Sequence, residues 1–79
     1  MELIATELPG VVVLAPRVHR DGRGAFLETW RAPRYAALGL PDRFAQDNLS
    51  VSAPGVLRGL HLQWPAAQAK LVWAAAGAV

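Results

Sequence analysis

Alternating apolar and polar residues predict that most of this chain forms short β-strands. Six segments carry a β-prone or alternating pattern: residues 3–6, 11–14, 25–30, 44–52, 56–63 and 70–75. The dipeptides Pro9-Gly10 and Pro54-Gly55 are turn signals between such segments. Five or six short strands with turns at this spacing indicate an antiparallel sandwich or barrel.

One segment favours a helix instead of a strand. Pro33 suits the first turn of a helix, Gly39 suits its end, and Pro41 prevents its return. We therefore expect one short helix around residues 33–38. The glycine-rich and charged residues 19–24 are expected to form a loop.

The length and composition allow one domain with a thin core. The chain has 79 residues, and a domain of about this size buries only roughly 60% of its unfolded surface. The hydrophobic fraction of 53% includes 15 alanines, so few large apolar side chains remain. Cysteine is absent, which excludes disulfides and thiolate metal sites.

The charge pattern argues against nucleic-acid and membrane partners. The net charge is +2, and the eight cationic residues form no run of the kind that binds nucleic acid. Glu2 stands where a secretory signal would be positively charged, and no apolar stretch approaches the roughly 20 residues of a membrane span. We expect a soluble, cytoplasmic protein.

The carboxy-terminal part differs from the rest. Residues 49–79 contain no acidic residue, and their only cations are Arg58 and Lys70. The chain ends in the apolar residues 74–79 without a polar tail or turn signal. We interpret this as a fold cut in mid-sheet, so that residues 1–79 are the amino-terminal part of one domain.

Polar residues interrupt the expected strand at residues 56–63. His61 and Gln63 share one face of an unbroken strand, and a bulge at Gly59 would bring Arg58 to that face. Lys70 opens the next strand and can pair beside them. The alternatives are a solvated arginine, a hydrogen-bonded core histidine and an ordinary edge-strand lysine.

Two more segments are candidates for binding. Gln46 and Asn48 lie on one face of a strand, whose alternative role is a solvated sheet surface. Arg23 and Glu28 flank a turn, where the alternative is a surface salt bridge worth about 0 to 1 kcal/mol. By default Phe26 is a core residue, and His19 is exposed without a role.

Together these segments resemble the dTDP-4-dehydrorhamnose 3,5-epimerases of the cupin superfamily, sugar-nucleotide enzymes of rhamnose biosynthesis. The matching motifs are Leu8-Pro9-Gly10-Val11, residues 21–28, residues 46–50, residues 55–63 and Ala69-Lys70-Leu71-Val72. The resemblance runs over essentially the whole chain but covers only the amino-terminal portion of the family's domain. It implies an all-β fold of the cupin jelly-roll type, truncated here.

The resemblance also implies a reaction. The family converts dTDP-4-dehydro-6-deoxy-D-glucose to dTDP-4-dehydro-L-rhamnose by removing protons from C3 and C5, both α to a ketone. His61 matches the catalytic base, and Lys70 matches the lysine at the keto group. No metal or organic cofactor is needed, and members are homodimers that share their amino-terminal strands.

Seven further positions match residues with which the family binds its substrate. They are Arg23, Phe26, Glu28, Gln46, Asp47, Asn48 and Arg58. A guanidinium suits diphosphate because its forked donors engage two oxygens at once. Side-chain amides suit neutral groups of the sugar or base.

Two alternatives to the enzyme remain open. The family's catalytic acid, a tyrosine, and the aspartate that orients the base match no residue of the chain, and Tyr35 is a poor substitute, so we expect the 79-residue chain alone to be inactive. It is then a truncated fragment or a non-catalytic nucleotide-sugar-binding remnant. The second alternative is a metal-binding cupin, because Gly55 and His61 begin that motif, but Gln63 replaces its second histidine.

Overall fold

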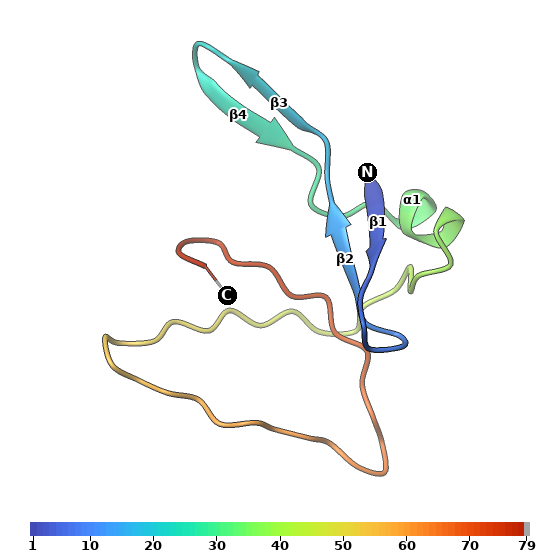
Figure 1. Ribbon diagram of the computed structural model, residues 1–79, viewed down its shortest axis with the longest axis vertical. Coiled ribbons are helices and arrows are strands. Elements are labelled where there is room, and N and C mark those ends of the chain that lie inside the picture. Colours follow the sequence, from blue (N-terminus) through green and yellow to red (C-terminus); the bar gives the residue numbers. More distant parts are fainter. Residues whose placement is uncertain (79) are drawn as a thin grey trace. The chain divides into compact units, whose positions relative to one another are not determined.

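The computed structural model describes residues 1–78, which fall into two units, residues 1–45 and the segment from residue 46 onward. Strands and the helix all lie in the first unit (Figure 1). They are β1 (Glu2–Ala5), β2 (Val12–Ala15), β3 (Val18–Asp21), β4 (Gly24–Leu27) and α1 (Ala32–Ala37). The prediction of antiparallel strands with one short helix is confirmed.

The first hairpin pairs β1 with β2, and Leu3 lies opposite Leu14. Its turn contains Gly10 with a φ of 82°, and the amide of Val11 donates to the carbonyl of Leu8 over 3.1 Å. A positive φ at the third residue of such a turn is the reason that glycine stands there. The turn predicted from Pro9-Gly10 is therefore confirmed.

The second hairpin corrects the loop expected at residues 19–24. These residues form most of β3, the turn and the start of β4, with His19 paired opposite Phe26 and Asp21 opposite Gly24. The charged side chains misled the prediction, because both faces of this hairpin are exposed and tolerate charge. The chain reverses at Gly22 and Arg23 alone.

Helix α1 lies within one residue of its predicted position. Pro33 stands in its first turn, and Gly39 follows its end with a φ of 75°, a conformation that favours glycine. Its one buried side chain is Tyr35, which is 2% exposed. The centroid of the Trp30 ring lies 6.2 Å from that of Tyr35 and 6.2 Å from that of Phe44, so Trp30 contacts both rings.

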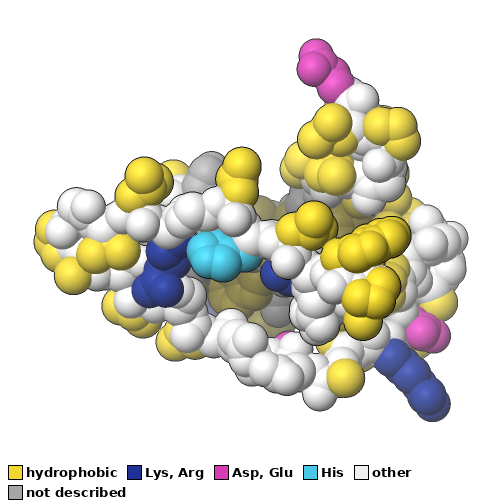
Figure 2. Space-filling view, turned by 90° about the horizontal axis from the view of Figure 1, so that it is seen from below, with side chains coloured by type: hydrophobic (Ala, Val, Ile, Leu, Met, Phe, Trp, Pro, Cys, Tyr) yellow, Lys and Arg dark blue, Asp and Glu magenta, His cyan; other side chains and the backbone are white. Residues whose placement is uncertain are grey.

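The second unit contains no strand or helix between residues 46 and 78, so the strands predicted at residues 44–52, 56–63 and 70–75 are wrong for this structure. The alternating sequence remains, but a strand needs a hydrogen-bonded neighbour, and the described part of the chain supplies none there. Leu57, Leu60 and Leu62 are 92%, 108% and 88% exposed. Figure 2 shows hydrophobic side chains spread over the visible surface.

Within residues 1–78, no helix has the length and apolar character to cross a membrane.

Candidate functional site

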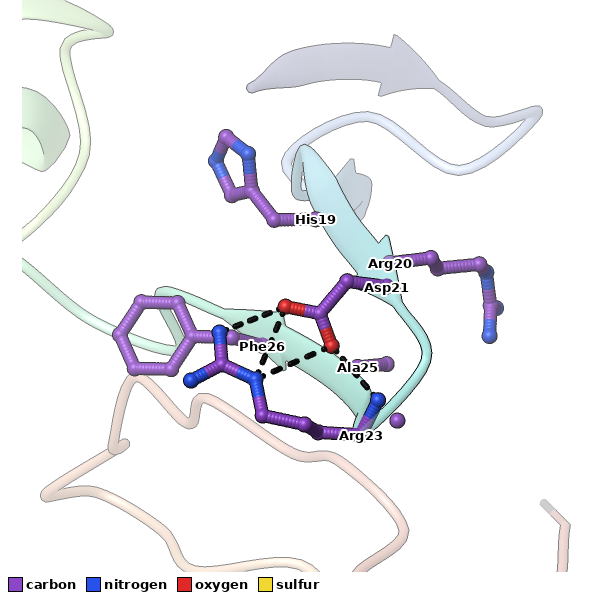
Figure 3. Close-up of a pocket in the computed structure, with 7 residues that line it drawn as sticks. His19, Arg20, Asp21, Arg23, Ala25 and Phe26 are labelled. Carbon is purple, nitrogen blue, oxygen red and sulfur yellow. Dashed lines mark hydrogen bonds and ion pairs between the residues drawn. The ribbon is translucent and has the colours of Figure 1, made fainter.

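The turn of the β3–β4 hairpin holds Arg23 against Asp21. Arg23 donates from Nη2 to Oδ2 of Asp21 over 2.6 Å and from Nε over 3.1 Å, and its backbone amide donates to Oδ1 over 2.8 Å. Figure 3 shows the Arg23 side chain folded back over the turn onto this carboxylate. The Arg23 side-chain hydrogen bonds lower the pKa of Asp21, and the backbone hydrogen bond adds to the effect.

This pair lines an open hollow of about 540 Å³ on the hairpin. The lining residues are His19, Arg20, Asp21, Arg23, Gly24, Ala25 and Phe26 (Figure 3). Phe26 is 73% exposed, so the default interpretation of this side chain as core is wrong. The hollow combines the guanidinium of Arg23, which pairs with Asp21, with the exposed ring of Phe26, on which a planar group can stack.

Glu28 follows β4 and contacts α1. Its Oε1 lies 2.7 Å from Nε of Arg34. A salt bridge between Arg23 and Glu28, the alternative drawn from the sequence, is not formed, because Arg23 pairs with Asp21 and Glu28 with Arg34. The sequence alone does not predict this contact of Arg34, because the spacing between residues 28 and 34 is no signal for a contact across the start of a helix.

The second unit brings His61 and Lys70 to one hollow of about 410 Å³. Leu62, Gln63 and Trp64 complete its lining. Nδ1 of His61 hydrogen-bonds the carbonyl oxygen of Gly59. Because a carbonyl only accepts, Nδ1 carries the proton, and the lone pair of the neutral ring lies on Nε2, the atom that can take up a proton.

Arg58 is engaged away from that hollow. Its Nε donates to Oγ of Ser52 over 2.9 Å, and its Nη2 donates to the carbonyl of Val51 over 3.3 Å. It is not among the residues that line the hollow of His61 and Lys70. The convergence of Arg58 with those two residues stays a prediction.

The amide pair of the second unit is local. Nε2 of Gln46 donates to Oδ1 of Asn48 over 3.0 Å, so the two side chains lie on one side of the segment, and Asp47 between them is exposed. Both amides retain further donors and acceptors for a ligand. Among residues 1–78, no group of three or more histidine, cysteine, aspartate or glutamate side chains could hold a metal ion.

Comparisons with known proteins agree on one family. Residues 5–79 match the sequence profile of the dTDP-4-dehydrorhamnose 3,5-epimerase family. The chain is 48% identical over 69 residues to a protein of that name from Methanothermobacter thermautotrophicus, a match covering 87% of this chain and 37% of the relative. The chain is also 47% identical over 81 residues to a protein of the same name from Escherichia coli strain K12. That match covers 100% of this chain and 44% of the relative.

A relative from Streptomyces niveus carries a different name. It is a dTDP-4-dehydrorhamnose 3-epimerase, 44% identical over 81 residues, a match covering 100% of this chain and 39% of the relative. The chain thus spans less than half the length of each of these curated relatives. No solved structure gives a significant match.

Proposed function

Because the chain belongs to the dTDP-4-dehydrorhamnose 3,5-epimerase family, we propose that it serves the epimerisation of dTDP-4-dehydro-6-deoxy-D-glucose at C3 and C5. The observation that carries this proposal is the common hollow of His61 and Lys70. A base and a cation in one hollow are the two groups that enolate formation requires. The product is dTDP-4-dehydro-L-rhamnose.

In the proposed reaction, Nε2 of His61 removes the proton from a carbon beside the ketone. The electron pair of that C–H bond moves into the ring as an enolate, and its negative charge gathers on the keto oxygen. The ammonium of Lys70, which lines the same hollow, is proposed to stabilise this oxygen by its positive charge. A separate acid on the opposite face, in the family a tyrosine that matches no residue of this chain, gives a proton to the carbon and inverts it.

The remaining predicted residues are proposed to bind the nucleotide sugar. Arg23 uses Nε and Nη2 on Asp21, so its Nη1 and the second hydrogen of Nη2 are the donors proposed for the diphosphate, beside the exposed ring of Phe26. Arg58 is proposed as a second cation for the substrate. Four further residues with donors and acceptors complete the set: Glu28, Gln46, Asp47 and Asn48.

A non-catalytic role in nucleotide-sugar binding is the second candidate. Tyr35 is the only tyrosine of the chain, it is 2% exposed, and its hydroxyl already donates to the carbonyl of Thr29 over 3.0 Å. It therefore cannot serve as the acid on the face opposite His61. The 79-residue chain alone is expected to bind dTDP without inverting either carbon.

A chimera tests the enzymatic proposal. Residues 1–79 replace the matching segment of the Escherichia coli relative, and the product is followed by NMR with the dTDP-4-dehydro sugar as substrate. Turnover that is lost in His61→Asn supports the proposal, and a folded but inactive parent chimera contradicts it. Calorimetric titration of the 79-residue chain with dTDP tests the second candidate: saturation without turnover supports binding, and no saturation contradicts it.

We also propose that the chain acts as a homodimer. The exposed apolar side chains of the second unit favour burial against other protein surface. Light scattering after gel filtration measures the mass of the particle, and a monomer at micromolar concentration would contradict the proposal.

A further inference from the structure

The carboxylate of Glu28 is held asymmetrically. Oε1 is shielded from solvent, and none of the described residues donates a well-aligned hydrogen bond to it, so its close polar contact is Nε of Arg34 at 2.7 Å. Only this oxygen is enclosed, which leaves Oε2 as the acceptor available to a ligand. The side chains of Arg34 and Glu28 are 42% and 35% exposed.

Helix α1 fixes the position from which Arg34 reaches Glu28. The hydroxyl of Tyr35 donates to the carbonyl of Thr29 over 3.0 Å, and the amide of Tyr35 donates to the carbonyl of Arg31 over 3.0 Å. The residue after Glu28 is therefore tied to the residue after Arg34. The contact between the rings of Trp30 and Tyr35 holds the same segment, residues 28–35, together.

We propose that Arg34 is a positioning residue that orients Glu28 and offsets its charge, so that Oε2 can accept a hydrogen bond from the nucleotide sugar. This inference rests on the proposed function, in which Glu28 binds that ligand. A carboxylate near a diphosphate repels it, and a neighbouring guanidinium cancels much of the repulsion. A half-exposed ion pair contributes little to the free energy of unfolding. The main effect of the Arg34–Glu28 pair is therefore expected on the affinity for the ligand.

Calorimetric titration of the 79-residue chain with dTDP and with dTDP-glucose tests the inference. The variants are Arg34→Gln, Arg34→Lys, Glu28→Ala and the double variant of Arg34→Gln with Glu28→Ala. Arg43→Gln is the matched control, because Arg43 is an exposed arginine of the same unit without an ion pair among the described residues. Hydrogen exchange of the Leu40 amide, which bonds the carbonyl of Tyr35, reports whether α1 persists.

Arg34→Gln is expected to weaken binding about tenfold, Arg34→Lys to recover most of the loss, and the control to change it less than about twofold. In the Glu28→Ala background, Arg34→Gln should cause no further loss. A ligand effect seen with dTDP-glucose but not dTDP would place the Oε2 contact on the sugar, and an effect on both would place it on the nucleotide.

The two proposals fail differently. If Glu28→Ala weakens binding while Arg34→Gln does not, or if Arg34→Gln weakens it equally without Glu28, the positioning role is overturned and the proposed function stands. If Glu28→Ala binds both ligands as the parent chain does, or the parent chain binds neither, the proposed role of Glu28 falls and this inference with it.

Discussion

The hydroxyl of Tyr35 lies 3.0 Å from the carbonyl oxygen of Thr29 and donates a hydrogen bond to it. This bond ties α1 to the end of the β3–β4 hairpin through the most buried side chain of the described residues. Helix α1 is therefore anchored to the segment that carries Glu28. The environment of the Tyr35 hydroxyl can be measured directly, because Tyr35 is the single tyrosine in the chain.

Tyr35 is predicted to ionise above its ordinary pKa of 10.0. Burial raises the pKa of this phenol, and the negative charge of Glu28 raises it further. The pKa of Tyr35 is higher in the folded than in the unfolded chain. The contribution of the neutral phenol to the free energy of unfolding is therefore fully present below pH 10 and is lost as the pH rises through the folded pKa. Ultraviolet titration of tyrosinate measures the midpoint, with the urea-unfolded chain as control. Equal midpoints in the two states would contradict the structure.

Tyr35→Phe is predicted to lower the free energy of unfolding by about 1 kcal/mol. The variant keeps the ring contact with Trp30 but loses the hydrogen bond to Thr29. Tyr35→Ala also removes the ring and should cost about 3 kcal/mol or more, enough to unfold so small a unit. Urea denaturation followed by circular dichroism measures both, with Arg43→Gln as control. The prediction fails if the two tyrosine variants are equally stable.

Asp21 is predicted to stay ionised below its ordinary pKa of 3.8. The side-chain hydrogen bonds from Arg23 lower the pKa of this carboxyl most, and the Arg23 amide adds to the effect. The folded pKa is depressed, so the stabilisation of the turn is present above pH 3.8 and lost as the pH falls through the folded value. Carbon-detected NMR follows the titration. Arg23→Gln should move the midpoint upward, and an unchanged midpoint would show that the contact is absent in solution.

His61→Asn is predicted to lower kcat of the chimera by roughly 10² to 10⁴-fold while KM changes little, because the base acts on the bound substrate. Lys70→Gln should also lower kcat, since the keto oxygen then loses its cation. Gln68→Ala, in the same segment but outside the lining of the hollow, is the matched control. Steady-state kinetics distinguishes the cases. Turnover that survives His61→Asn would remove this histidine as the base.

The chain is predicted to bind no stoichiometric iron, manganese or zinc. His61 is followed by Gln63 where a metal-binding cupin has a second histidine, and residues 49–79 hold no carboxylate side chain. Elemental analysis of the purified protein and turnover of the chimera after EDTA treatment test this. A stoichiometric metal, or activity that EDTA removes and metal restores, would favour the metal-binding alternative.

The sequence was sufficient where structure depends on near neighbours. The turn at Pro9-Gly10, the first two strands and the helix were all predicted, because glycine conformation, proline and local alternation act within a few residues. The family was also recognisable from short ordered motifs. By contrast, the composition of residues 19–24 predicts a loop, whereas the structure forms a hairpin there, because an exposed hairpin accepts charge on both faces.

The sequence by itself determined the family, the antiparallel character and the residue types available for chemistry. Only the tertiary structure decided the partners: Arg23 with Asp21, Glu28 with Arg34, and His61 with Lys70 in one hollow. It also decided that residues 46–78 form no strand despite their alternation. The physical reason is that pairing depends on where the backbone brings two segments together, whereas composition and periodicity describe each segment alone.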